Sequence, residues 1–389
     1  MSRDPGALLD RVGDLVAERM DAGRVHTARR RHADILAGRE SDYIPMIFGR
    51  AVPEAKDLPN FNWAEQWHNP ARSLYQQLKD NVLPLVAADS DAVPGVRADT
   101  GVINCMTIFG AEFVVPEHTK PVISKYVPKE RLAGFEVPED VSRLGIMPTV
   151  AAHMEHHKAA LAERGLGNLV SVYHCDQQGP WDIAAQSRGH DIFIDLYEDP
   201  QFVHTLMRKA VRIYIAVTKL CKRTSGEPLD SGNTVGYWSE TGGVRMCGDS
   251  DILVRREQFA EFIQPYEQEA LAAFGGGWFH YCGGWPGTGR SEGLHLHDLY
   301  AEIKGLRGLN WTTARDWLAE MRRLVDLGLA HLGTLPRAEG ESLEDYFRRA
   351  LSPYARRGGM IFTHPELKDG EVECAMDLWH RVQDERLGT

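Results

Sequence analysis

Strand and helix signals alternate along most of this 389-residue chain, and that alternation limits the folds open to it. Eight short apolar segments, each bounded by Gly, Pro, Asn or Asp, have the length and composition of strands. They lie at residues 43–48, 93–102, 168–176, 234–246, 277–282, 306–311, 328–334 and 359–363. Strands that alternate with helices pair in parallel. Eight such units without a GxGxxG turn predict an α/β fold of the (β/α)8 TIM-barrel type rather than an open doubly wound sheet.

Helical periodicity marks the segments between the strands. Asp199-Pro200 has the form of an N-cap followed by proline at the first helical position, and apolar residues then repeat every three or four positions. Similar patterns predict helices at 5–37, 256–274, 317–327 and 343–351. We predict one domain over residues 1–389, with a helical extension at 1–41, the barrel at 42–389, and an elaborated loop over the barrel mouth at 117–143.

Composition excludes several classes of protein. No apolar run approaches the roughly 20 residues of a membrane span, and a net charge of -11 argues against a general nucleic-acid surface, which leaves a small-molecule substrate. The first 20 residues carry acids among their apolar residues and lack a hydrophobic signal core, so we expect a cytoplasmic protein. Six scattered cysteines without a CxxC pair indicate neither a disulfide scaffold nor a zinc ribbon.

In barrels of this kind the chemistry lies on the loops that follow the strands. Only Cys221 is placed on a predicted helix. The other five cysteines fall at or after strand candidates, at Cys105, Cys175, Cys247, Cys282 and Cys374. Cys105 and Cys221 are most simply explained as small buried hydrophobic residues.

His280 and Cys282 form the pattern with the clearest chemical meaning. On an extended strand, residues two apart point to the same face, so this imidazole and this thiol are placed to bind zinc together. The alternative is a histidine buried against the barrel wall with its nitrogens bonded to the backbone. Further ligands remain open. His364 and Glu366 at the end of the eighth strand candidate are favoured, and the loop alternatives are His295, His297 and Cys374.

Polar residues at other strand ends are candidates for the substrate site. Asp176 is the preferred acid or base, and Asp249 is a second candidate, whereas Asp182 fits a helix cap equally well. Arginine at a barrel mouth commonly binds a carboxylate or phosphate, although a solvated surface arginine is the alternative. The predicted substrate-binding residues are Arg50, Arg97, Gln177, Arg245, Asn310 and Trp311.

Five segments together resemble the uroporphyrinogen decarboxylase superfamily. They are RRRHADILAGRESDYIP at 29–45, QGPWDIA at 178–184, DLYEDPQFV at 195–203, FIQPY at 262–266 and GLNW at 308–311. Each is moderately specific, but their order and spacing cover most of the chain. The resemblance implies the same barrel.

Within that superfamily, the true porphyrinogen decarboxylases carry an RQAGRY signature that binds propionates, and this chain has FGRAVPE at 48–54 instead. The methylcobamide:coenzyme M methyltransferases use zinc bound by His-x-Cys on the fifth strand and by a distant cysteine after the eighth. His280-Tyr281-Cys282 is similar to the first part of that site. His364-Pro365-Glu366 stands where the distant cysteine would be expected, and Cys374 comes later.

These observations lead to one hypothesis and two alternatives. The hypothesis is a zinc-dependent transferase that moves a methyl or other small group to a metal-activated nucleophile, with His280 and Cys282 as ligands and His364 as the favoured third. The alternatives are a metal-independent decarboxylase or lyase of a carboxylated substrate, tetrapyrrole-like or smaller, held by Arg50 and Arg97, and a non-catalytic barrel that binds a tetrapyrrole or corrinoid. The resemblance implies that a corrinoid would arrive on a partner protein and that the chain forms a homodimer.

Overall fold

The computed structural model describes residues 3–284 and 292–388. Its main sheet is parallel, in the order β1 (Met46–Ile47), β12 (Met360–Thr363), β11 (Ala330–Gly333), β10 (Leu306–Trp311), β9 (Gly277–Tyr281), β8 (Val244–Cys247). A separate parallel pair joins β2 (Gly95–Arg97) to β5 (Ser171–Tyr173). Two antiparallel pairs join β3 (Glu112–Val114) to β4 (Val122–Lys125), and β6 (Gly232–Thr234) to β7 (Tyr237–Ser239).

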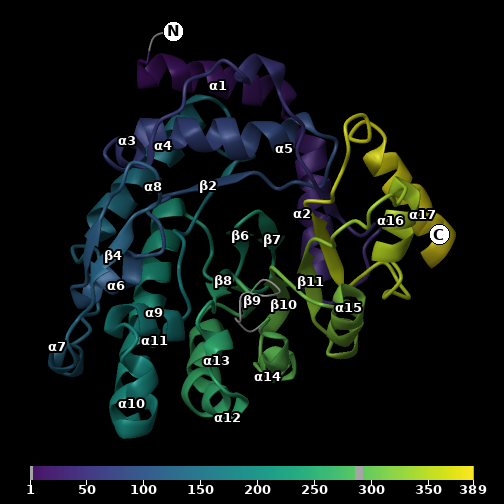
Figure 1. The fold of residues 1–389 in the computed structure, drawn as a ribbon. Coiled ribbons are helices and arrows are strands. Elements are labelled where there is room, and N and C mark those ends of the chain that lie inside the picture. Colours follow the sequence, from purple (N-terminus) through teal and green to yellow (C-terminus); the bar gives the residue numbers. More distant parts are fainter. Residues whose placement is uncertain (1–2, 285–291, 389) are drawn as a thin grey trace.

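Helices alternate with these strands and lie outside them (Figure 1). Those of the first half are α1 (Pro5–Arg19), α2 (Ala22–Leu36), α3 (Trp63–Trp67), α4 (Pro70–Gln77), α5 (Leu83–Ala87), α6 (Asn104–Phe109), α7 (Lys129–Gly134), α8 (Met147–Glu163), α9 (Pro180–Arg188) and α10 (Ile192–Glu198). Those of the second half are α11 (Pro200–Ser225), α12 (Arg256–Gln258), α13 (Gln264–Ala272), α14 (His297–Ala301), α15 (Trp317–Asp326), α16 (Leu343–Ala350) and α17 (Ala375–Leu387). Across the described ranges, no helix combines the length and apolar character needed to cross a bilayer.

All eight predicted strand segments contain a parallel strand, so the structure confirms an α/β protein with a parallel sheet and alternating helices. Among the described residues, no strand pairing joins β2 and β5 to the main sheet. The prediction of one strand over 234–246 is wrong. The chain there reverses after β6, with Val235 at φ 58° and Gly236 at φ 87°, and only then enters β8. Positive φ at two successive residues is the geometry of a tight hairpin turn.

Two helix predictions and the placement of one cysteine also need correction. The segment 5–37 is two helices, because the Asp21 side chain accepts a hydrogen bond from the Arg24 N–H and caps a new helix there. The segment 256–274 contains a π-helical turn before α13, since Pro265 lacks the N–H that a continuous α-helix needs. Cys105 lies on α6 rather than after a strand.

The predicted apolar stripe of the first helix is buried within the chain itself. Leu8, Leu9, Val12 and Val16 are all buried, and α1 packs against α4 and α5. These four side chains therefore need no second copy of the chain to cover them. By contrast, the prediction for α11 is confirmed. The Asp199 side chain accepts from the Phe202 N–H at 3.1 Å, and Pro200 begins the helix.

The N-cap of α4 supports a helix that reaches the candidate site. The Asn69 side chain accepts from the N–H groups of Ala71 and Arg72, at 3.0 and 3.2 Å, and Pro70 follows it. Asn69→Ala is expected to lower the free energy of unfolding by about 1 kcal/mol, because it leaves these donors without a partner. Chemical denaturation measures this. The control is Asn168→Ala on an exposed loop, and an equal loss in both variants would contradict the capping role.

Candidate active site

The pairing of β8 with β9 builds the centre of the candidate site. In this register Cys247 lies opposite His280, and the extended backbone places His280 and Cys282 on one face, as predicted. His280 Nε2 is 3.3 Å from the Cys282 Sγ atom. Tyr281 points the other way, into the core, where its hydroxyl lies 2.6 Å from His297 Nε2. The predicted His-x-Cys geometry is therefore present.

Asp249, in the loop after β8, joins this group. Its Oδ1 atom accepts a hydrogen bond from the Cys282 N–H at 2.6 Å. One ligand atom from each of Cys247, Asp249 and His280 lies within 4.8 Å of the other two. This sulfur, oxygen and nitrogen set could hold a metal ion, and zinc accepts all three donor types.

Asn310 fixes the orientation of His280. Its side-chain N–H donates to the Leu332 carbonyl, so the amide oxygen faces His280 Nδ1 at 2.5 Å. That oxygen can only accept, which places the imidazole proton on Nδ1 and leaves the lone pair of Nε2 toward Cys282. In metal-binding histidines the ring nitrogen that does not bind the metal typically donates its proton to an acceptor of this kind. Asn310 was predicted to bind substrate, and the structure shows instead how it positions an imidazole.

Burial sets the protonation of this group. It raises the pKa of the Cys247 thiol, and burial followed by the Asp249 charge raises the pKa of Cys282 to about 12. Burial followed by the Arg245 charge lowers the pKa of His280. At neutral pH the imidazole is thus neutral and ready to coordinate, whereas the thiols need a bound cation to become thiolates.

A buried carboxyl group holds the loop that carries Asp249. The Asp182 side chain in the first turn of α9 accepts from the N–H groups of Asp249 and Ser250, at 2.8 and 2.7 Å. The sequence suggested a helix cap or chemistry for Asp182, and the structure shows it supporting a neighbouring loop. Burial, followed by the Asp249 charge, raises the pKa of Asp182 to about 7.

This shift predicts a pH dependence of stability. Because the folded-state pKa of Asp182 lies above the value of about 4 expected for an unfolded chain, ionisation of this group destabilises the fold as the pH rises through about 7. In metal-free protein, the free energy of unfolding is therefore expected to fall more between pH 5 and pH 8 in the wild type than in Asp182→Asn. Denaturant titrations at both pH values test this, and identical slopes would contradict it.

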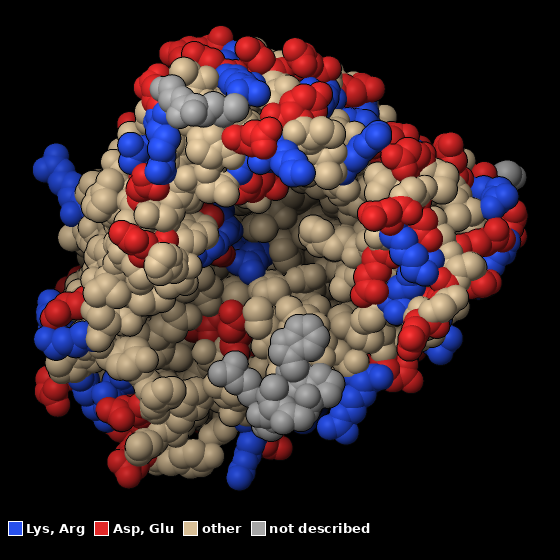
Figure 2. Space-filling model, turned by 45° about the horizontal axis from the view of Figure 1, so that its top comes forward, with Lys and Arg blue, Asp and Glu red and all other residues tan. Residues whose placement is uncertain are grey.

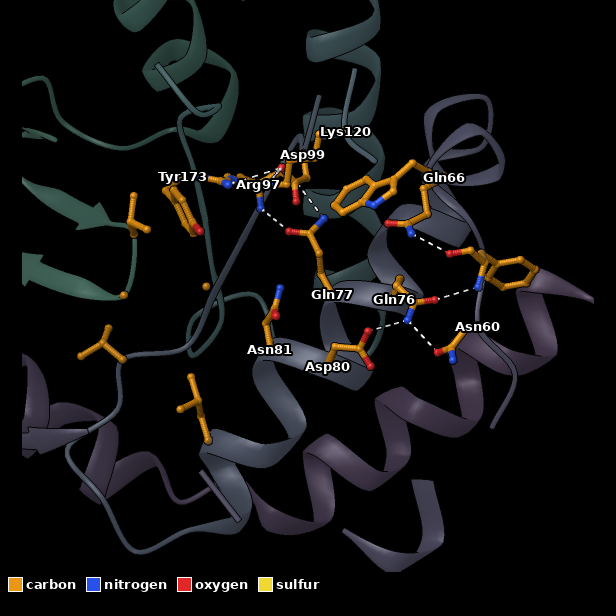
Figure 3. A pocket seen from close by; sticks show the side chains of 17 residues that line it. Asn60, Gln66, Gln76, Gln77, Asp80, Asn81, Arg97, Asp99, Lys120 and Tyr173 are labelled. Carbon is orange, nitrogen blue, oxygen red and sulfur yellow. Dashed lines mark hydrogen bonds and ion pairs between the residues drawn. The ribbon is translucent and has the colours of Figure 1, made fainter. Parts of the chain in front are cut away.

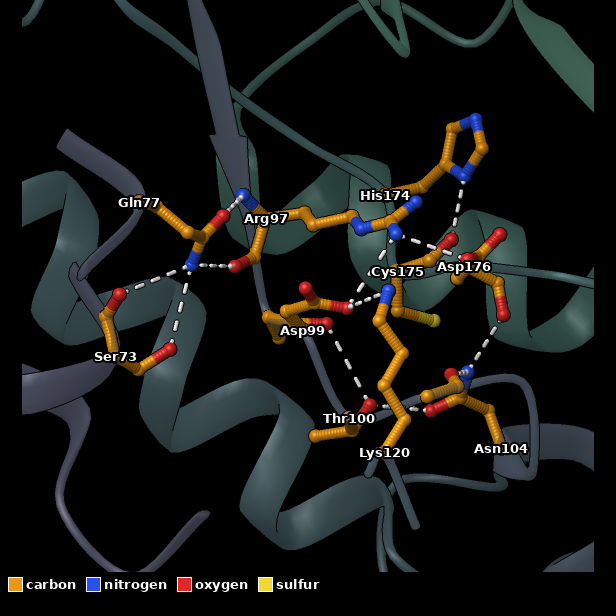
Figure 4. A network of polar contacts seen from close by, with 12 residues as sticks. Ser73, Gln77, Arg97, Asp99, Thr100, Asn104, Lys120, His174, Cys175 and Asp176 are labelled. Carbon is orange, nitrogen blue, oxygen red and sulfur yellow. Dashed lines mark hydrogen bonds and ion pairs between the residues drawn. The ribbon is translucent and has the colours of Figure 1, made fainter. Parts of the chain in front are cut away.

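Two arginines contact the Asp176 carboxylate, and Figure 4 shows the contact with the first of them, Arg97. Arg97 contacts the Asp176 carboxylate at 2.9 Å and Arg245 contacts it at 2.7 Å. Burial alone would raise the pKa of Asp176, but the charges of Arg97 and Arg245 outweigh burial and hold that pKa well below its usual range. The carboxylate therefore stays ionised at neutral pH, so its geometry suits orientation of the two guanidinium groups rather than proton transfer.

Arg97 is also a wall of a cavity of about 720 Å³ (Figure 3). The Gln77 carboxamide accepts a hydrogen bond from the Arg97 N–H and donates one to the Arg97 carbonyl, both at 2.9 Å. These two bonds replace those of a neighbouring strand and so position the Arg97 backbone. Asn81 and Tyr173 point into the cavity. The rest of the polar and aromatic lining includes Asn60, Phe61, Trp63, Gln66 and Gln76. Figure 2 shows one face hollowed near its middle, with basic and acidic side chains inside the hollow.

Several predicted site residues lie elsewhere. Arg50 is exposed and pairs with Glu373 at 3.2 Å. Gln177 is buried beneath α11, where its side-chain oxygen accepts from the Thr218 hydroxyl at 2.7 Å. Trp311 is buried and stacks on the Trp317 ring. Cys175 is buried in the core, where its sulfur lies 3.7 Å from the sulfur of Cys221.

The proposed further metal ligands do not join His280 either. His364 is exposed at the end of β12, and among the described residues it belongs to no group of potential ligand atoms. His297 is buried between Tyr281 and Glu320, and His295 Nε2 lies 3.1 Å from the Val254 carbonyl. Glu366 and Cys374 are exposed. The potential ligand atoms that do lie close to His280 belong to Cys247 and Asp249.

Comparisons with known proteins find similarity at the level of structure. No family model matches the sequence, and no curated protein matches it. The structure is similar to that of a methyltransferase from Methanosarcina mazei, with a TM-score of 0.65. The two proteins share a fold. The match covers 92% of this chain and 98% of the other, at 15% sequence identity.

Proposed function

We propose that this protein is a zinc-dependent transferase that moves a methyl or other small group to a metal-activated nucleophile. The observation that carries the proposal is the group of Cys247, Asp249 and His280 with Cys282 beside it. The shared fold with a methyltransferase supports the same conclusion. So does the sequence resemblance to the methyltransferase branch of the uroporphyrinogen decarboxylase superfamily.

His280 is the central ligand of the proposed site. Cys247 and Asp249 complete the group, and Cys282 is placed to supply a further sulfur. Zinc held by three of these four residues would stabilise a thiolate or a similar nucleophile near neutral pH, and its fourth coordination position would remain for substrate. Asn310 holds the imidazole proton on Nδ1, and Asp182 holds the backbone that carries Asp249.

The adjoining cavity is the proposed place for the substrate. Arg97 lines this cavity and is linked through Asp176 to Arg245, which lies on β8 two residues before Cys247. In this proposal the linked ion pairs connect the cavity to the metal-ligand group and orient the reacting groups. Both cations of the lining, Arg97 and Lys120, are paired with Asp99. Paired cations make a poor carboxylate receptor, which favours group transfer over a decarboxylase or lyase that relies on Arg50 and Arg97.

Three further features belong to the same proposal. The eight parallel strands close into the predicted barrel, with β2 and β5 between the two edges of the main sheet. The methyl donor is a corrinoid carried by a partner protein. The protein works as a homodimer.

A methyl-transfer assay tests the activity. Protein depleted of metal and then restored with zinc is mixed with free methylcobalamin and a panel of small thiols. We expect methylcobalamin absorbance to fall and a methyl thioether to form, both only after zinc is restored. Equal rates with and without zinc would overturn the metal-dependent mechanism. Release of CO₂ from carboxylic acids by metal-free protein, without any thioether, would support the lyase instead.

A further inference from the structure

A second cavity lies at the end of the main sheet opposite the candidate active site. Cys247 and Cys282 lie at or just after the carboxyl ends of β8 and β9, whereas this cavity borders the amino ends of β10, β11 and β12. It measures about 580 Å³ and also touches the end of α2. This volume is within the range of about 300–1,000 Å³ that small-molecule sites occupy.

The walls of this second cavity are apolar. Ile35, Leu36, Leu306 and Leu329 line it and are buried, and Val325, 39% exposed, stands among the lining residues. Gly38 and Gly328 also belong to the lining, and a Cβ atom built on either would meet nothing within 4 Å. The space is therefore not filled by neighbouring side chains of the described chain, and it suits an alkyl or aryl group.

Two polar side chains in this lining lack partners. Tyr354 is only 6% exposed, and its hydroxyl makes no hydrogen bond within the described ranges. Arg307 has no hydrogen bond or ion pair to any described residue, and its Nε atom is enclosed. No acidic residue lines the cavity. Arg307 is half-buried, and a guanidinium without a counter-ion in the lining of an apolar cavity points to an absent acceptor with negative charge.

We propose that this cavity is a second binding site, for a small amphipathic carboxylic acid. Its carboxylate pairs with the Arg307 guanidinium, and its alkyl or aryl part packs on the apolar walls. A cationic ligand would place its charge beside the positive charge of Arg307, and a neutral ligand would leave Arg307 without a counter-ion. The remaining arginine of the lining, Arg356, is exposed and lies 3.8 Å from Glu40.

Isothermal titration calorimetry with matched ligands tests this site. Octanoate and phenylacetate are compared with octan-1-ol and octylamine on the full-length protein. We expect at least one acid to bind about tenfold more tightly than either of the two uncarboxylated ligands. Arg307→Gln should abolish that preference, and Arg307→Lys, which keeps the charge but loses the planar fork of the guanidinium, should weaken acid binding several-fold. Arg322→Gln, at an exposed position of α15 outside the cavity, is the matched control.

The outcomes separate this site from the proposed transferase. Binding of neither acid, equal binding of octanoate and octylamine, or full acid binding by Arg307→Gln would each overturn the proposal. Circular dichroism and thermal denaturation show whether the variants are folded, and Arg307→Lys keeps a test available should Arg307→Gln not fold. Zinc content is measured on the same samples and should not change, since the cavity lies at the other end of the sheet.

Discussion

A His280→Ala variant is expected to lose stoichiometric zinc and methyl transfer together. His280 provides the one nitrogen of the proposed ligand group. Its imidazole lies close to the Cys282 sulfur and also to the ligand atoms of Cys247 and Asp249. Asn310→Ala should keep all the ligands but bind zinc about 10–100-fold more weakly, because the imidazole loses the partner that fixes its proton on Nδ1. Competition with a chromophoric chelator measures both affinities.

The control for these variants is His118→Ala, at an exposed position outside the ligand group. It should bind zinc as the wild type does. Cys282→Ser adds a second comparison, since serine is a far poorer ligand for zinc than cysteine. Wild-type zinc affinity in His280→Ala would contradict the proposed site, whereas normal affinity in Cys282→Ser alone would restrict the ligands to Cys247, Asp249 and His280.

Asp176→Asn is expected to produce the largest loss of stability among the variants of the site. The carboxylate is shared by Arg97 and Arg245, whose side chains are 12% and 10% exposed, so the variant leaves two nearly buried cations without this counter-ion. Removing one partner of a buried pair costs about 3–5 kcal/mol. Urea denaturation at pH 7 gives this value directly. The exposed Asp369→Asn serves as control and should change little.

The low pKa of Asp176 also gives the sign of a pH effect. A carboxyl group whose pKa is lower in the folded than in the unfolded protein stabilises the fold at pH values above the unfolded-state pKa. This stabilisation is lost as the pH falls from the unfolded-state pKa toward the folded-state pKa. The wild type should therefore lose stability below about pH 4 more steeply than Asp176→Asn. If the free energy of unfolding fell equally steeply with decreasing pH in the two proteins, the Asp176 carboxylate would not be stabilising the buried arginines.

The sequence predicted the features that depend on local periodicity. Residues two apart on a strand share a face, and this periodicity alone predicts that His280 lies beside Cys282. The cap at Asp199 and the course of α11 follow from equally local signals. The break before α2 was missed because Asp21, a good N-cap, lies within a continuous helical pattern.

Features that depend on pairing between distant segments were not predicted. Cys247 meets His280 only through the register of β8 against β9, and β8 was assigned to a longer strand that is in fact a hairpin followed by β8. Asp176, Arg97 and Arg245 were each named as candidates, yet nothing local shows that one carboxylate joins both arginines. The amide-rich cavity was missed because much of its lining lies between residues 60 and 81, away from any strand end.

Elemental analysis of the purified wild-type protein tests the central claim most directly. Protein expressed with added zinc and freed of loosely bound metal by gel filtration should contain one zinc ion per chain. X-ray absorption at the zinc edge should then show sulfur together with nitrogen or oxygen neighbours, as Cys247, Asp249 and His280 require. Protein without stoichiometric metal after this treatment, or zinc with no sulfur neighbour, would contradict the proposed site.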